Sequence, residues 1–274
     1  MSEFRVACLQ TCTGTTPEDN FTALTSLIRE AAQEGAEFIL TPETCNFMPL
    51  NKETRRSTMQ FENDDKMVAS FAALAAELKI TLLAGSFILT GDSDKAVNRS
   101  ICFNPLGDVV ARYDKIHLFD VELDNGERHS ESAHYEAGQE AVIADLSYGK
   151  LGMTICYDLR FPALYRALAM HGADFISVPA AFTKMTGEAH WHVLLRARAI
   201  ETGCFIFAPA QSGTHENGRK TYGHSIIVSP WGRVLADAGL ETQVIYADID
   251  TDQVQMARRQ IPALEHGRQF KPPV

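Results

Sequence analysis

Short apolar runs bounded by Gly, Pro or Asn recur along the whole chain, and this pattern most constrains how it can fold. Runs of this kind are typical of buried strands. Several of them are separated by segments with helical spacing of apolar residues, and this alternation predicts a layered α/β protein whose sheets are covered by helices. The predicted strands cover residues 4–9, 38–41, 80–88, 101–104, 141–146, 151–156, 175–179, 205–210, 224–229 and 244–249.

The helical pattern is clearest near the amino end. Leu24, Ile28 and Ala31 recur at helical spacing, Thr16 is a possible N-cap, and Pro17 occupies the first helical position. Further helices are expected near 63–78, 161–171, 188–202 and 251–259. No linker rich in Pro, Ser or Gly divides the chain, so we predict one domain over residues 1–274, with a long irregular stretch at about 115–140.

Composition excludes several classes of protein. The 274 residues are 45% hydrophobic, which excludes a disordered chain, and 25 basic against 35 acidic side chains give a net charge of −10. No basic stripe is present, so we expect no nucleic-acid partner. No apolar run approaches the ~20 residues that span a bilayer, and no secretory leader is visible, so we expect no membrane partner and a cytoplasmic location. The six cysteines include no C-x-x-C pair, and a disulfide framework is not expected.

Signatures of common cofactor and metal sites are absent. The sequence contains no G-x-x-x-x-G-K-[ST], no G-x-G-x-x-G after its first strand, no G-x-S-x-G and no H-E-x-x-H. The pair His190 and His192 has metal-like spacing, but residues two apart on a helix point in different directions. We therefore expect neither a metal nor an organic cofactor.

Three predicted strands end in a residue that can do chemistry. Glu43 follows the run 38–41, Lys115 follows a strand that begins at Val109, and Cys156 ends the run 151–156. Ligands of α/β proteins bind beyond the carboxyl ends of strands. The three side chains are therefore placed for function.

Each of the three residues also has an ordinary interpretation. Glu43 could cap a helix or pair with a surface lysine, Lys115 could be solvated, and Cys156 could be a small buried hydrophobe. The start of the next helix and a nearby cation would favour the Cys156 thiolate. Together, a thiol, a base and a cation supply what acyl transfer requires: a nucleophile, a proton acceptor and a stabiliser of the oxyanion.

Three motifs carry a resemblance to a known family. They are TPE at 41–43, YDKIHLFD at 113–120 and GMTICYDLRFP at 152–162. In order and spacing they are similar to those of the nitrilase-like carbon-nitrogen hydrolases, and the similarity runs from about residue 4 to 268. The resemblance implies a four-layer αββα sandwich and a homodimer or homotetramer.

The resemblance also implies a role for each site residue. Glu43 would be the general base, Cys156 the nucleophile that attacks an amide carbonyl, and Lys115 with the backbone N–H of Tyr157 would hold the oxyanion. Glu131 matches an additional glutamate of the family that positions substrate or tunes Lys115. Its ordinary interpretation is a loop carboxylate.

Substrate recognition is assigned to a second group of residues. Relatives that act on carboxylated substrates place a carboxylate-binding arginine where Arg160 stands, and the alternative for Arg160 is a structural ion pair with Asp158 or another acid. Phe182 and Thr183 follow another strand end and are candidates to line the pocket. The expected partner is thus a small carboxylated amide.

The branch of the family is indicated by HWHVLLRARAIE at 190–201, YGHS at 222–225 and PWG at 230–232. These segments are most similar to the branch that hydrolyses deaminated glutathione to α-ketoglutarate and cysteinylglycine. Asp114, Ala163 and His192 depart from the usual pattern without touching the triad. Two alternatives stay open: an ω-amidase that converts α-ketoglutaramate or a similar monoamide to a dicarboxylate and ammonia, and a non-catalytic binding or scaffold member.

Overall fold

The chain folds around two six-stranded sheets. A computed structural model describes residues 3–93, 95–124, 126–271 and 273. The first sheet has the order β16 (Gln243–Asp250), β1 (Glu3–Gln10), β2 (Phe38–Leu40), β3 (Thr81–Thr90), β4 (Ala96–Phe103) and β5 (Val109–Asp114). The second has the order β15 (Val234–Asp237), β14 (Ile226–Val228), β11 (Phe205–Ala208), β10 (Phe175–Ser177), β9 (Gly149–Met153) and β8 (Val142–Leu146).

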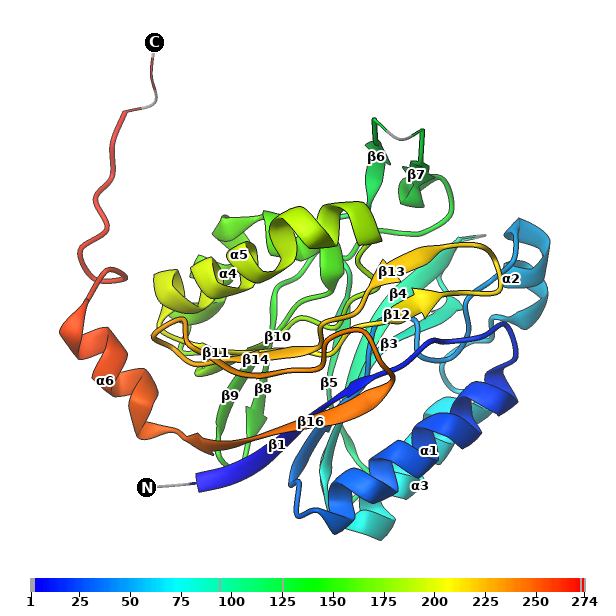
Figure 1. Ribbon diagram of the computed structural model, residues 1–274, viewed down its shortest axis with the longest axis horizontal. Helices are drawn as coiled ribbons and strands as arrows, with labels where there is room; N and C mark the ends of the chain where they lie inside the picture. Colours follow the sequence, from blue (N-terminus) through cyan, green and yellow to red (C-terminus); the bar gives the residue numbers. More distant parts are fainter. Residues whose placement is uncertain (1–2, 94, 125, 272, 274) are drawn as a thin grey trace.

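Helices cover the outer faces of these sheets (Figure 1). α1 (Pro17–Gln33) and α3 (Lys66–Leu78) lie on the side of the first sheet, and α4 (Pro162–Met170) and α5 (Lys184–Thr202) lie on the side of the second. α2 (Lys52–Thr58) and α6 (Asp252–Gln260) complete the helices of the described residues. None of the helices in this part of the chain has the length and apolar character needed to cross a bilayer.

Side-chain alternation along the strands explains the layers. In β1, Val6 and Cys8 belong to the core between the sheets, whereas Ala7 and Leu9 pack with the helices α1 and α3. Successive residues of a strand point to opposite faces, so a strand that is apolar at every position must be covered on both sides. The four-layer αββα sandwich predicted from the sequence is thereby confirmed.

Most predicted elements are present. A strand occupies each of the ten predicted runs, and a helix lies in each of the five predicted segments. Thr16 is the N-cap of α1 and Pro17 its first residue, although the Thr16 side chain makes no capping hydrogen bond. The run 151–156 is shorter than predicted because β9 ends at Met153, and Cys156 has a left-handed backbone conformation with φ 49° that a strand cannot contain.

The prediction of an irregular stretch at 115–140 is wrong in part. Residues of this stretch form an antiparallel hairpin of β6 (Asp120–Glu122) and β7 (Arg128–Ser130), followed by the 3₁₀ helix η1 (Glu131–Ala133). Polar three-residue strands carry no apolar alternation, so periodicity does not reveal them. The same reason applies to the second hairpin, β12 (Ser212–Thr214) with β13 (Lys220–Tyr222), which the sequence also did not predict.

The centre of each sheet is parallel, and this positions the site. β1, β2 and β3 run parallel in one sheet, and β9, β10 and β11 in the other. Isolated bridges lie beyond the strands: the first, between Thr11 and Gln211, links the two sheets, and the second, between Ala180 and Ala210, extends the pairing of β10 with β11. The first bridge joins a segment following β1 to one following β11, so the carboxyl ends of the two sheets meet at one edge of the sandwich.

Candidate active site

Glu43, Lys115 and Cys156 meet in one buried cluster. Lys115 Nζ lies 3.0 Å from Glu43 Oε1, and Cys156 lines the same cavity as both and interacts with the Glu43 carboxylate closely enough to lower its pKa. All three residues are almost completely buried, with 3%, 2% and 7% of their surfaces exposed. They follow β2, β5 and β9 respectively, so two elements of the first sheet and one of the second build the cluster.

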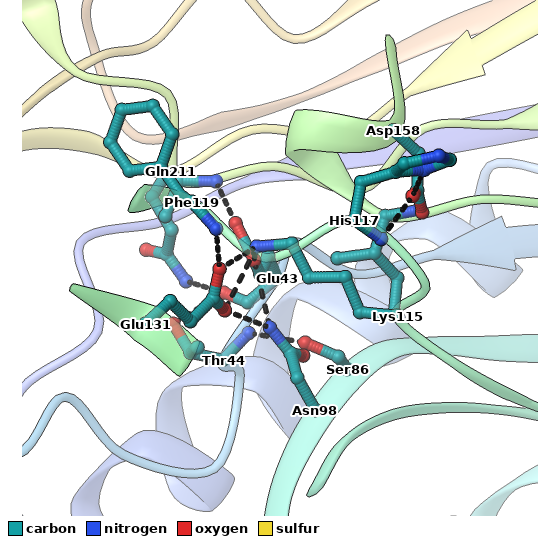
Figure 2. Close-up of polar contacts among 12 residues, drawn as sticks. Glu43, Thr44, Ser86, Asn98, Lys115, His117, Phe119, Glu131, Asp158 and Gln211 are labelled. Atoms are coloured by element: carbon teal, nitrogen blue, oxygen red, sulfur yellow. Dashed lines mark hydrogen bonds and ion pairs between the residues drawn. The ribbon is translucent and has the colours of Figure 1, made fainter. Parts of the chain in front are cut away.

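A close approach of two backbones positions Glu43. A Cβ atom at position 85 would lie 1.8 Å from the carbonyl oxygen of Thr41, so only glycine allows β3 to pass this close to the end of β2. The Glu43 carbonyl oxygen accepts a hydrogen bond from Gln211 Nε2 at 2.9 Å, and Thr44 N donates to Ser86 Oγ at 2.8 Å (Figure 2). These bonds fix the backbone on both sides of the carboxylate.

The nucleophile candidate has an unusual backbone. Cys156 begins the 3₁₀ helix η2 (Cys156–Arg160) with φ 49°, and its N–H donates to the Pro179 carbonyl at 3.0 Å. A left-handed conformation at a residue other than glycine is disfavoured and is found preferentially at functional sites. The N–H of Tyr157 belongs to the first turn of η2, where N–H groups have no intrahelical partner, so it is placed to bind a ligand.

Both oxygens of Glu43 are occupied by donors. Asn98 Nδ2 donates to Oε1 at 2.9 Å and the backbone N–H of Ala181 donates to Oε2 at 2.7 Å, in addition to the contact with Lys115. Hydrogen bonds to the charged form of a carboxylate favour ionisation. Glu43 is therefore held as an oriented carboxylate.

Lys115 is shared by two carboxylates. Its Nζ lies 2.9 Å from Glu131 Oε1 and 2.8 Å from Oε2, and Glu131 Oε2 also accepts a 2.6 Å hydrogen bond from the backbone N–H of Phe119 (Figure 2). Glu131 is thus attached to both the ammonium and the segment behind it, which a solvated loop carboxylate would not be. It positions Lys115 toward Glu43.

Burial and charge set the protonation states of the cluster. Burial would raise the pKa of Glu43, but the positive charges of Lys115 and Arg219 and the hydrogen bond from Cys156 outweigh it, so this pKa lies below its usual range. Burial lowers the pKa of Lys115, but the charges of Glu131 and Glu43 raise it well above the ordinary value. The resting cluster therefore contains an ionised Glu43 and a protonated Lys115.

The Cys156 side chain is a thiol in the resting cluster. Burial and the negative charge of Glu43 raise the pKa of the thiol well above its usual value, and the opposing charge of Lys115 is the smaller influence. η2 has only five residues, so it contributes little dipole. In the resting state the Cys156 thiol lies beside the Glu43 carboxylate, which can accept the thiol proton.

Asp158 connects the segment that carries Lys115 to the one that carries Cys156. It is fully buried; Tyr113 Oη donates to its Oδ2 at 2.7 Å, and its Oδ1 lies 2.7 Å from His117 Nδ1. The backbone N–H groups of His117 and Ile155 donate to the same carboxylate at 3.0 and 2.9 Å. The alternative in which Arg160 pairs with Asp158 is not what the structure shows.

Replacing Asp158 by asparagine should destabilise the fold by about 2–3 kcal/mol, because an amide turns one of its two acceptor positions into a donor that faces other donors in a buried place. Urea unfolding measures this free energy. Asp145→Asn is the matched control, since the Asp145 side chain is 82% exposed and its loss should change stability by less than about 0.5 kcal/mol. Equal midpoints for the two variants would contradict the connecting role of Asp158.

A cavity of about 400 Å³ opens above the cluster, which is the size range of small-molecule sites. Among the residues predicted to bind substrate, Tyr157, Phe182 and Thr183 line it. Arg160 is not among the lining residues. Its guanidinium lies 5.2 Å from the centre of the Phe182 ring and 6.0 Å from that of Tyr157, so Arg160 contacts two residues that do line the cavity.

The two histidines of α5 diverge, as their spacing predicts. His190 Nδ1 lies 3.3 Å from the Arg160 guanidinium, whereas His192 Nε2 lies 2.8 Å from Asp237 Oδ2. His224 Nδ1 contacts the other oxygen of Asp237 at 2.8 Å. The pair 190 and 192 therefore does not converge on one point.

Three residues of the site were missed in the sequence. Asn98 is a buried amide of β4, but Arg99 and Ser100 follow it directly, so the polarity of this stretch does not single it out. Gln211 and Arg219 lie in polar segments around the β12–β13 hairpin, where no pattern distinguishes them from surface residues. Arg219 lines the cavity.

Comparisons with known proteins agree with this geometry. The family model described as carbon-nitrogen hydrolase matches residues 5–259. A Synechocystis protein named deaminated glutathione amidase is 41% identical over 97% of this chain and 98% of its own, and a Yersinia enterocolitica protein of the same name is 39% identical over 98% and 94%. The crystal structure of the Caenorhabditis elegans NitFhit protein superposes with a TM-score of 0.91 at 35% identity, over 98% of this chain and 66% of that one. The chain belongs to the carbon-nitrogen hydrolase family, and it is a hydrolase that acts on carbon-nitrogen bonds.

Proposed function

We propose that the protein is a thiol-dependent amidase that hydrolyses deaminated glutathione to α-ketoglutarate and cysteinylglycine through a cysteinyl thioester. The observation that carries the proposal is the buried cluster of Glu43, Lys115 and Cys156 at the floor of the cavity. The relatives named deaminated glutathione amidase, which align along nearly the whole chain, support the choice of substrate.

In the first step, the thiol of Cys156 attacks the amide carbonyl while its proton passes to Glu43. The new carbon–sulfur bond forms as the carbonyl π pair moves to oxygen, and the oxyanion is stabilised by the Lys115 ammonium and the Tyr157 N–H. Because the pKa of the thiol is raised and that of the carboxyl is lowered, proton transfer and attack proceed together rather than from a preformed thiolate.

In the second step, protonated Glu43 gives its proton to the departing amine, the carbon–nitrogen bond breaks, and cysteinylglycine leaves. Water then enters, Glu43 accepts one of its protons, and the hydroxide attacks the thioester. The carbon–sulfur bond breaks, and the sulfur of Cys156 recovers the proton from Glu43. Side chains supply every proton and charge in these steps, so the proposal requires no metal or organic cofactor.

The pH dependence of kcat/KM follows from these protonation states. Activity requires ionised Glu43, whose pKa lies below the ordinary 4.5, so the acid limb should fall below pH 4.5. Cys156 and Lys115 titrate above their ordinary values of 9.0 and 10.5, so both keep their protons across the neutral range. The rate should therefore be flat from about pH 5 to about pH 8. A pH profile of kcat/KM measures this, and an acid limb centred near neutrality would contradict an ionised resting base.

The substrate is tested by comparing deaminated glutathione with α-ketoglutaramate at equal enzyme concentration, following α-ketoglutarate release. We expect kcat/KM to be higher for deaminated glutathione. Negligible turnover of deaminated glutathione with rapid turnover of α-ketoglutaramate would replace the proposal by an ω-amidase. No turnover of any amide would favour a binding or scaffold protein.

We further propose that the chain forms a homodimer or homotetramer in the cytoplasm. Large apolar side chains are exposed along α4 and α5 and on the adjacent turn, among them Met170, Val193, Ile200 and Trp231. Apolar surface of this kind is typical of interfaces between subunits. Sedimentation equilibrium measures the mass, and a species of one chain at micromolar concentration would contradict the proposal.

A further inference from the structure

Arg219 is a cation of the cavity wall without a carboxylate partner. Its Nη2 donates to the Ala181 carbonyl, while its Nε is buried and has no hydrogen-bond partner. Within the described part of the chain, no carboxylate lies within ion-pair distance of its guanidinium. An arginine that is partly buried and incompletely satisfied by the protein is destabilising unless something else binds it.

The other lysine and arginine side chains that line this wall each have a carboxylate partner. Lys115 is held between Glu43 and Glu131, and Arg128 is paired with Glu122. Arg219 influences the same cluster only at longer range, through its charge on Glu43 and Cys156. Among the described residues that line the cavity, Arg219 is therefore the lysine or arginine without a carboxylate partner.

The β12–β13 hairpin holds Arg219 at a fixed place. Its turn is anchored by His215, whose ring nitrogens contact the Thr13 carbonyl at 2.9 Å and Thr221 Oγ1 at 2.8 Å. On the other side, Tyr222 N donates to the Phe182 carbonyl at 2.9 Å, which docks the hairpin on the segment that lines the cavity. These contacts hold Arg219 in the cavity wall beside the cluster.

We propose that Arg219 forms the carboxylate-binding subsite of this pocket. A planar guanidinium fits a carboxylate in a bidentate manner. A carboxylate is the group that each of the two proposed amide substrates offers to such a guanidinium. Arg160, the carboxylate-binding candidate of the sequence, is not among the residues that line the cavity, although its guanidinium lies against the rings of Phe182 and Tyr157.

This inference rests on the proposed amidase function and adds the basis of its substrate choice. Deaminated glutathione carries one carboxylate on the acyl part and a second at the end of the leaving dipeptide. Either carboxylate would pair with Arg219. Substrates that lack one or both carboxylates show which of the two Arg219 binds.

The experiment measures kcat/KM of the Arg219→Gln variant on three substrates: deaminated glutathione, α-ketoglutaramate, and a neutral aliphatic amide. Loss of a charge-assisted hydrogen bond should lower kcat/KM for deaminated glutathione by about 10- to 100-fold, mainly through KM, and leave the neutral amide within about threefold. An equal loss on α-ketoglutaramate assigns Arg219 to the acyl carboxylate, and an unaffected α-ketoglutaramate assigns it to the dipeptide carboxylate.

Two further variants control for indirect effects. Arg29→Gln removes an arginine that is paired with Glu77 and does not line the cavity, and it should lower kcat/KM for deaminated glutathione far less than Arg219→Gln does. Arg219→Lys keeps the charge without the bidentate geometry and should have an intermediate KM. Thermal melting of each variant shows that it is folded.

The inference is overturned if Arg219→Gln loses the same factor on the neutral amide as on the carboxylated substrates, or if it loses nothing on any of them. Should Arg219→Gln fail to fold, the Arg219→Lys variant decides alone, through the ratio of carboxylated to neutral substrate. A wild-type protein that turns over no amide contradicts the proposed function itself, and this result is separate from the selectivity of the variants.

Discussion

Cys156→Ala should fold like the parent chain and lose amide hydrolysis by on the order of 10⁴-fold or more, because no other group near Glu43 can form the covalent intermediate. The substitution removes one sulfur from a small buried residue and keeps the backbone geometry available. Single-turnover assays with α-ketoglutarate release as the readout measure the remaining rate, and the wild-type enzyme should show an acyl adduct by mass spectrometry that the variant lacks.

Cys102→Ala is the matched control for this change. Cys102 lies fully buried in β4, where it packs in the core between the sheets. Losing its sulfur should reduce stability by about 1 kcal/mol without lowering kcat. Substantial turnover by Cys156→Ala, or an equal loss of activity in Cys102→Ala, would discard Cys156 as the nucleophile.

Lys115→Met should damage both stability and activity. The ammonium separates two buried carboxylates, Glu43 and Glu131, so its removal leaves their negative charges facing each other at an expected cost of about 3–5 kcal/mol. The oxyanion loses its strongest stabiliser, so kcat should fall by about 10²- to 10³-fold or more. Urea unfolding and steady-state kinetics measure the two effects.

A second substitution separates these effects of Lys115. In the double variant Lys115→Met with Glu131→Gln, one of the two repelling charges is gone, so part of the lost stability should return. The rate should not return, because the cation is still missing. A double variant that regains activity along with stability would show that Lys115 acts on folding alone.

The fold was largely predictable because its strands are apolar at successive positions and its helices have a clear spacing. β3 is buried over nine of its ten residues, and α1 buries Leu24, Ile28 and Ala31 at helical intervals. The polar hairpins β6–β7 and β12–β13 have no such pattern, since their positions are fixed by contacts with distant parts of the chain.

The site was predictable to a different degree for each residue. Glu43, Lys115 and Cys156 end apolar strands, so the sequence alone indicates that they lie at an edge of the sheets. Arg219 follows no strand of either large sheet, and its relation to the cavity depends on how one hairpin docks against residues 181–183. The strength of the effect of burial on the Cys156 pKa depends on the packing of both sheets, which no local pattern of the sequence specifies.

Because the cluster is divided between two sheets, amide hydrolysis depends on how the two sheets pack against each other. Glu43 and Lys115 follow strands of the first sheet, and Cys156 follows a strand of the second. Hydrolysis therefore requires the two sheets to be packed together. The turnover rate should report a loosening of this packing more sensitively than circular dichroism does. Each sheet can keep its strands and helices after Cys156 has separated from Glu43.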